Sequence, residues 1–190
     1  MENYISRKKI ESTDFTLTPL PKGEYEACEF TSCEFSGSDI SAISFVDCTF
    51  KDCNLSNVNL AKTALREVSF ISCKMLGLQF YKCHSFGLSF SFSDCNLSHS
   101  SFFQTKIKKT NFNNCNLTNV DFTNCDLSSA TLLQCDLTNA KFDNSILEKT
   151  DFSSSFNFVI FPNSNKLNGA KFSKSGLHGL LTGYGIEIVE

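Results

Sequence analysis

A five-residue period is the feature that most constrains how this chain folds. Within Asn111–Leu137 a large apolar residue returns at every fifth position, and a small or thiol side chain stands two residues before each one. An α-helix places its apolar residues three and four apart, and a half-buried strand places them two apart, so neither element explains the pattern. A short fixed period predicts a repeat architecture, in which each unit buries its apolar residue only against stacked neighbours.

The period covers most of the chain. Large apolar residues fill eleven consecutive slots from Phe30 to Phe80 and thirteen from Phe92 to Phe152. Phe80 and Phe92 are twelve residues apart instead of ten, so two extra residues have entered between them. We therefore expect a bulge or short loop within residues 81–91.

The two ends of the repeat are less regular. We expect one domain, a repeat rod over residues 1–172, with an imperfect coil or cap at 1–27 where the small positions are poorly filled. After Phe152 the rule fails at Asn157 and Pro162. This failure predicts a distorted last coil over residues 153–172.

Composition and charge exclude several classes of protein. The net charge of −3 gives no strong attraction to nucleic acid or to an acidic membrane. The chain has no run of about 18 apolar residues and no charged-then-apolar leader at Met1–Leu20, so we expect neither a membrane span nor a signal peptide. The expected location is the cytoplasm, with no membrane partner and no direct nucleic-acid partner.

The cysteines and histidines do not indicate a reactive site. All ten cysteines occupy the small position of the repeat, which favours packing as small hydrophobes over a disulfide framework. Thiols packed among apolar neighbours do not converge tetrahedrally, so we expect no zinc. His84, His99 and His178 are far apart in the sequence, and no phosphate-binding glycine loop is present. We expect no catalytic residues, no metal and no cofactor.

Units such as CNLTN, CDLSS, CDLTN and AKFDN resemble those of the pentapeptide repeat family, whose signature is A(D/N)LXX. The resemblance implies an all-β fold, a right-handed quadrilateral β-helix with four pentapeptides per coil. Residues 20 apart should then stack, or 22 apart across the bulge. One inward column would consist of thiols, namely Cys33, Cys53, Cys73, Cys95, Cys115 and Cys135.

Residues 173–190 change character. Ser173 or Ser175 is a plausible N-cap, and Gly183 or Gly185 could end a short helix. Ile186 and Ile188 alternate as a brief strand.

This tail resembles the C-terminal segment of the Qnr quinolone-resistance proteins and the microcin-immunity protein McbG. In that group the terminal helix joins two solenoids into a dimer, and the rod binds type II topoisomerases, above all DNA gyrase, partly by resembling duplex DNA. The resemblance implies a homodimer; the alternative is that the tail only caps the last coil. The candidate dimer contacts are Leu177, Leu180, Leu181, Tyr184 and Ile186.

The charges are distributed in bands. Residues 22–52 carry seven acids and two bases, a net charge of −5, and residues 111–151 carry six acids and two bases, a net charge of −4. Residues 62–109 between them carry seven bases and two acids, a net charge of +5. Duplex DNA carries about one negative charge per 1.7 Å, and no exposed column here is continuously acidic. The Qnr proteins also carry projecting loops that matter for protecting gyrase, whereas this chain has only a two-residue surplus.

The bulge and the basic band form the candidate partner-binding site. By the 20-residue count, the bulge shares one face with several basic residues, which could meet phosphate or an acidic partner. The alternative is an ordinary solvated surface. Acidic side chains of the next band would stand in for phosphates. The candidate residues are Arg66, Lys82, His84, Lys106, Lys108 and Lys109 together with Asp121, Asp126 and Asp136.

The expected function is non-catalytic binding of another macromolecule, because a β-helix filled with side chains has no cleft for a substrate. The more specific expectation is a Qnr-like or McbG-like modulator of DNA gyrase or topoisomerase IV. The alternative is a protein-interaction scaffold without a topoisomerase partner.

Overall fold

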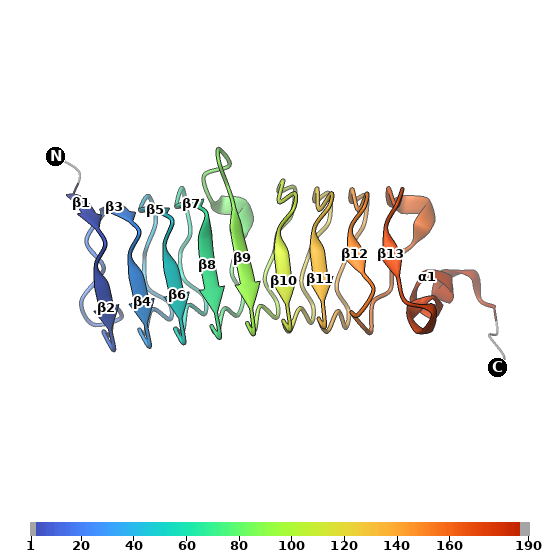
Figure 1. The fold of residues 1–190 in the computed structure, drawn as a ribbon, viewed down its shortest axis with the longest axis horizontal. Helices are drawn as coiled ribbons and strands as arrows, with labels where there is room; N and C mark the ends of the chain where they lie inside the picture. The colour runs from blue at the N-terminus through green and yellow to red at the C-terminus, as the bar shows by residue number, and fades with distance from the viewer. Residues whose placement is uncertain (1–2, 187–190) are drawn as a thin grey trace.

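A computed structural model describes residues 3–186 of the chain. The chain winds as a right-handed, four-sided β-helix, with the N-terminus at one end and a short helix, α1, at the other (Figure 1). The expected all-β quadrilateral fold is confirmed.

Two walls of the β-helix are parallel sheets. Residues 20 apart pair in register, as Phe30 does with Phe50, and Phe70 pairs with Phe92 at the expected spacing of 22. Among the described residues the first wall has four strands: β1 (Asn3–Ser6), β3 (Gly23–Glu26), β5 (Ser44–Val46) and β7 (Ala64–Arg66). The second has nine: β2 (Lys9–Glu11), β4 (Glu29–Thr31), β6 (Thr49–Lys51), β8 (Val68–Ile71), β9 (Phe90–Ser93), β10 (Asn111–Asn113), β11 (Thr131–Leu133), β12 (Asp151–Phe152) and β13 (Lys171–Phe172).

The other two walls are ladders of single β-bridges. The third wall runs through Asn54, Lys74 and Asn96, and the fourth through Ser101 and Asp121. Beyond the bulge the first wall also continues as single bridges, beginning with Lys106 and Asp126. Side chains at equal positions in successive coils therefore form outward-facing columns.

The interior is a stack of rings and thiols. Phe30 and Phe50 stack with centroids 4.7 Å apart, and Phe92 and Phe112 with centroids 5.0 Å apart. These spacings match the distance of about 4.8 Å between hydrogen-bonded strands. All ten cysteines are free and buried, which confirms their packing role.

The thiols also act as hydrogen-bond donors to the preceding coil. Cys95 Sγ donates to the carbonyl of Phe70 at 3.4 Å. In other columns Ser145 Oγ donates in the same way to the carbonyl of Phe122 at 2.7 Å. The small position of the repeat therefore suits side chains that fit inside and donate to backbone oxygen.

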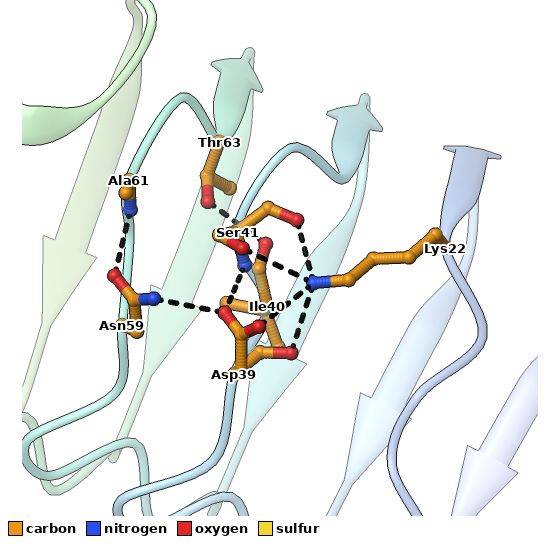
Figure 2. A network of polar contacts seen from close by, with 7 residues as sticks. All are labelled: Lys22, Asp39, Ile40, Ser41, Asn59, Ala61 and Thr63. Carbon is orange, nitrogen blue, oxygen red and sulfur yellow. Dashed lines mark hydrogen bonds and ion pairs between the residues drawn. The ribbon is translucent and has the colours of Figure 1, made fainter.

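Many corners are shaped by two positions of the repeat, and Figure 2 shows the bonds of the first of them at Asp39. Asp39 Oδ1 accepts from the Ser41 backbone N–H at 2.9 Å and from Asn59 Nδ2 of the next coil at 3.0 Å. Ala42, the residue after Ser41, has a left-handed φ of +55°. Left-handed residues recur at every fifth position along most of the rod. Asp and Asn favour such local turns because their side-chain oxygen reaches the backbone N–H two residues on.

The first coil joins both sheets through β1 and β2, and it is irregular after Glu11 except for a bridge between Asp14 and Glu34. Leu17 in this irregular part is 80% exposed.

The opposite end departs from the repeat after Phe152. It contains the 3₁₀ turns η2 (Pro162–Ser164), η3 (Lys174–Gly176) and η4 (Thr182–Tyr184), with α1 at His178–Leu181. Ser173 Oγ accepts from the Gly176 N–H and caps η3, and Gly185 ends the tail turns with a φ of +63°. The strand predicted around Ile186 and Ile188 was wrong at Ile186, which has no regular secondary structure, and Ile188 lies outside the described residues.

Candidate functional site

The two-residue surplus forms a loop that projects from the rod between β8 and β9 (Figure 1). The turn η1 (Phe80–Lys82) precedes this loop, which spans residues 83–89. The loop replaces the strand that the first wall would have placed beside β7. Hydrogen bonds fix it to the preceding coil: the His84 N–H donates to the Thr63 carbonyl at 2.8 Å, and the Glu67 N–H to Ser89 Oγ at 2.7 Å.

Phe90 fills the interior behind the loop. It occupies a small position of the repeat, where the neighbouring coils have Val68 and Thr110. Its ring centroid lies 5.3 Å from that of Phe80 and 5.1 Å from that of Phe92. The large ring restores the core volume that the displaced wall would otherwise leave empty, so the loop projects without opening the interior.

The basic residues predicted from the sequence gather around this loop, but unequally. Lys106 and Lys108 follow Arg66 along the first wall, whereas Lys82 ends η1 at the corner with the fourth wall and Lys109 forms a left-handed corner. Arg66 lies under the loop: a Cβ built on Gly87 would be 3.4 Å from Arg66 Nε. Lys108 Nζ pairs with Asp126 at 3.1 Å.

His84 holds the loop from within. Its Nδ1 accepts from the Phe86 N–H at 3.3 Å, which requires that this nitrogen carry no proton. The side chain is therefore engaged in shaping the loop tip.

The three candidate aspartates lie on three different walls. Asp121 bridges Ser101 on the fourth wall, Asp126 bridges Lys106 on the first, and Asp136 bridges Asn116 on the third. Each accepts a hydrogen bond from the N–H two residues on. The fold does not assemble them into one acidic surface, and each serves a corner of the coil.

Hydrogen bonds shift the pKa of the mostly buried carboxyl of Asp126. Burial works to raise its pKa, but hydrogen bonds from the Ser128 hydroxyl and N–H and the Lys108 ammonium outweigh burial and hold the pKa of Asp126 below its usual value. A carboxyl with a lowered folded-state pKa stabilises the fold above its unfolded pKa and loses that contribution as the pH falls through the folded value.

We expect Asp126→Asn to reduce the loss of stability in acid. At neutral pH the variant should lose less than about 1 kcal/mol, because Asn keeps the turn and gives up one partly exposed ion pair. Between about pH 5 and pH 2 its free energy of unfolding should fall less steeply than that of the natural chain. Urea unfolding across this range measures the difference. Asp143→Asn, at an exposed position, is the matched control, and equal pH profiles for the two variants would contradict the assignment.

Two of the buried thiols, Cys83 and Cys125, are unsuited to reaction. Burial raises the pKa of Cys83 to about 12 and that of Cys125 to about 12, so both stay protonated at neutral pH. Within residues 3–186 no group of His, Cys, Asp and Glu side chains is arranged to hold a metal ion.

The helices of residues 3–186 are too short or too polar to span a membrane.

Sequence reasoning missed the apolar side chains beside the loop. Phe86 at the loop tip is 74% exposed, and Phe103 stands in an outward column that continues with Thr123 and Asp143 in the following coils. The pair of adjacent phenylalanines at 102 and 103 was the available signal, since only the first of them is in phase with the repeat.

The predicted dimer contacts divide into two groups. Leu177, Tyr184 and Ile186 are exposed, whereas Leu180 and Leu181 are half-buried, and Leu180 packs against the end of the core. Exposed apolar side chains of the last coil join the first group, namely Phe156, Val159 and Phe161. The C-terminal end of the rod therefore presents apolar side chains to solvent.

Two structures of QnrB1 share this fold. A trypsin-treated form of QnrB1, a plasmid-mediated fluoroquinolone resistance protein, superposes with a TM-score of 0.65 at 18% identity, covering 100% of both chains. Full-length QnrB1 gives a TM-score of 0.59 at 16% identity, covering 97% of this chain and 100% of QnrB1. HetL, a pentapeptide repeat protein of the cyanobacterium Nostoc involved in heterocyst differentiation regulation, gives 0.36 at 15% identity, covering 89% of this chain and 86% of HetL.

No curated protein sequence matches the chain. At such low identities, the likeness to QnrB1 shows a common fold. The family model of the pentapeptide repeat region matches residues 24–91 and 86–152, which is more than half of the chain. Together with the 20-residue register of the coils, this match shows that the chain belongs to the pentapeptide repeat family.

Proposed function

We propose that this protein is a non-catalytic, protein-binding rod that modulates or protects a type II topoisomerase, either DNA gyrase or topoisomerase IV. The observation that carries the proposal is the full-length likeness to the fold of QnrB1, whose stated role is fluoroquinolone resistance. The interior, filled with stacked rings and thiols, supports a role for the outer surface.

The N-terminal part of the rod supplies the negative charge for this proposal. Glu24 lies on β3, and Asp47 and Asp52 form exposed left-handed corners of the following coil. In the proposed complex these carboxylates stand in for DNA phosphates at the enzyme's DNA-binding surface. The basic band of residues 62–109 interrupts the acidic surface, so the mimicry is confined to part of the rod.

The apolar C-terminal end supports a homodimer as part of the same proposal. Tyr184 is 51% exposed and Leu177 43% exposed, and burial against a second copy would remove this apolar area from water. Sedimentation should give twice the chain mass of 21.2 kDa. The chain mass itself would mean that the tail only caps the rod.

A supercoiling assay with a fluoroquinolone tests the proposed function. The protein should inhibit gyrase or topoisomerase IV when added alone, or raise the drug concentration that halves supercoiling. Neutralising the acidic end with Glu24→Gln, Asp47→Asn and Asp52→Asn should weaken the effect several-fold, because the carboxylates that stand in for phosphates are lost. The fold should be kept, because Asn also tolerates left-handed corners. The matched control, Lys62→Gln with Lys74→Gln, should leave the effect in place.

A specific observation favours a second candidate, a scaffold for a different protein. The third-wall column passes from Glu34 through Asn54 to Lys74 and Asn96, so it changes sign within the length of the rod. For this candidate, neither topoisomerase would respond with or without the drug. Reversing Lys82, Lys106 and Lys108 to Glu would then abolish binding to the scaffold's partner, whereas unchanged binding would make the basic residues ordinary surface.

A further inference from the structure

A hollow of about 640 Å³ lies between the projecting loop and the coil that follows it. Phe86 and Leu88 line it from the loop, Phe103 and Lys106 line it from the next coil, and Phe80 and Cys83 form its floor. Binding sites for small molecules commonly have volumes of about 300–1,000 Å³. The hollow exists because the loop is tied to the preceding coil and leaves the next coil uncovered on the first wall.

The walls of this loop pocket are aromatic. Tyr81 and Phe103 meet edge to face with centroids 6.4 Å apart, and Phe86 also lines the pocket from the loop tip. Elsewhere on the rod the outward positions of the repeat are mostly polar, so these rings are a local exception. A flat apolar ligand would remove their exposed area from water and stack against them.

The charge at the pocket is positive. Lys106 is the charged side chain among the lining residues, and within residues 3–186 it forms no ion pair. The nearest carboxylate along its column, Asp126, is already engaged by Lys108 and by the Ser128 hydroxyl. Lys82 Nζ, 6.0 Å from the centroid of the Tyr81 ring, adds a second positive charge near the rim. An anionic group would be attracted to this side of the pocket.

The pocket is held open by the loop's own hydrogen bonds. The bond from the Phe86 N–H to His84 Nδ1 fixes the tip, and Gly87 turns the chain back with a φ of +71° while packing on Arg66. Phe90 fills the core behind the floor. A ligand would therefore meet walls that are already in place, and binding would cost little ordering.

We propose that the loop pocket is a binding site for a small aromatic anion, with the aromatic body between Phe86 and Phe103 and the anionic group at Lys106. The proposal concerns this pocket alone and does not depend on a topoisomerase partner. It gives the loop a role as part of a small-molecule site, distinct from contact with a macromolecule.

Two fluorescent probes that differ only in charge test the proposal. The aromatic sulfonate 8-anilinonaphthalene-1-sulfonate should bind the natural protein at one saturable site per loop pocket. N-phenyl-1-naphthylamine, the same skeleton without the sulfonate, should bind more weakly. Lys106→Gln should weaken binding of the sulfonate about tenfold and leave the neutral probe unchanged, since one charge-assisted contact is lost. Phe86→Ser should weaken binding of both probes.

Control variants separate this pocket from other surfaces. Lys109→Gln removes a charge from the same coil outside the pocket lining and should leave both affinities unchanged. Tyr184→Ser tests the apolar C-terminal end, and it should also leave them unchanged. The proposal is overturned if no saturable binding occurs, if Lys106→Gln and Phe86→Ser bind the sulfonate as the natural protein does, or if Tyr184→Ser removes the binding. Circular dichroism of each variant confirms that the rod remains folded.

Discussion

Replacing Phe92 with alanine is expected to lower the free energy of unfolding by about 3–5 kcal/mol. The Phe92 side chain is fully buried, stacked between the rings of Phe70 at 5.3 Å and Phe112 at 5.0 Å, with the edges of Phe80 and Phe102 nearby. The cavity that the missing ring leaves would collapse poorly, because hydrogen bonds between the strands fix the spacing of the coils on either side of it. Urea unfolding of the purified variant measures the loss.

The matched control is the same substitution at Phe86. This side chain is 74% exposed, so Phe86→Ala should change the free energy of unfolding by no more than about 0.5 kcal/mol. If Phe92→Ala were equally mild, the ring stack could not be the main source of stability.

Gly179→Ala is expected to detach the C-terminal tail from the rod. A Cβ at this position would lie 2.2 Å from the Phe158 carbonyl oxygen and 2.8 Å from its ring. The close approach allows the Ile160 N–H to donate to the Gly179 carbonyl at 3.0 Å. Overpacking and loss of this bond should together weaken docking of the tail by on the order of 2–4 kcal/mol.

Hydrogen exchange measures this detachment directly. In Gly179→Ala the amide of Ile160 should exchange quickly, whereas the amides of β10 keep their protection. Since the proposed dimer contacts lie on the tail, the variant should also sediment as a monomer. Lys174→Ala, which truncates an exposed side chain of the same tail, is the control. Native protection at Ile160 in Gly179→Ala would show that the tail docks in another way.

The fold followed from the sequence because one rule repeats. The stacking of Phe30 on Phe50, and of Phe70 on Phe92 across the surplus, needed only the period and the coil length of the family. The sequence alone did not explain why Asp and Asn recur in the repeat, but the structure does. As at Asp39, their side chains close the corner that precedes each left-handed residue.

The candidate site was harder to predict because it arises where the rule fails. The spacing located the two-residue surplus, but the loop's direction depends on bonds such as that from the His84 N–H to the Thr63 carbonyl. Treating Asp121, Asp126 and Asp136 as one acidic group overlooked the four walls, since residues five or ten apart face different directions. The pocket needs both Phe86 and Phe103 in its lining, and no local sequence pattern brings these two residues together.

The walls, the columns and the pocket all depend on a coil of 20 residues, in which residues 20 apart lie side by side on one wall. Cross-linking of engineered thiols tests this spacing most directly. Asn111 and Thr131 face each other on β10 and β11, with Thr131 Oγ1 donating to Asn111 Oδ1 at 2.8 Å. The natural cysteines are buried and should stay unreactive in the folded protein. In Asn111→Cys with Thr131→Cys, the short bifunctional thiol reagent dibromobimane should bridge both thiols rapidly and become fluorescent. In Asn111→Cys with Asp121→Cys, whose positions lie on different walls, it should bridge none. Bridging of the second pair, or failure to bridge the first, would contradict the four-sided coil.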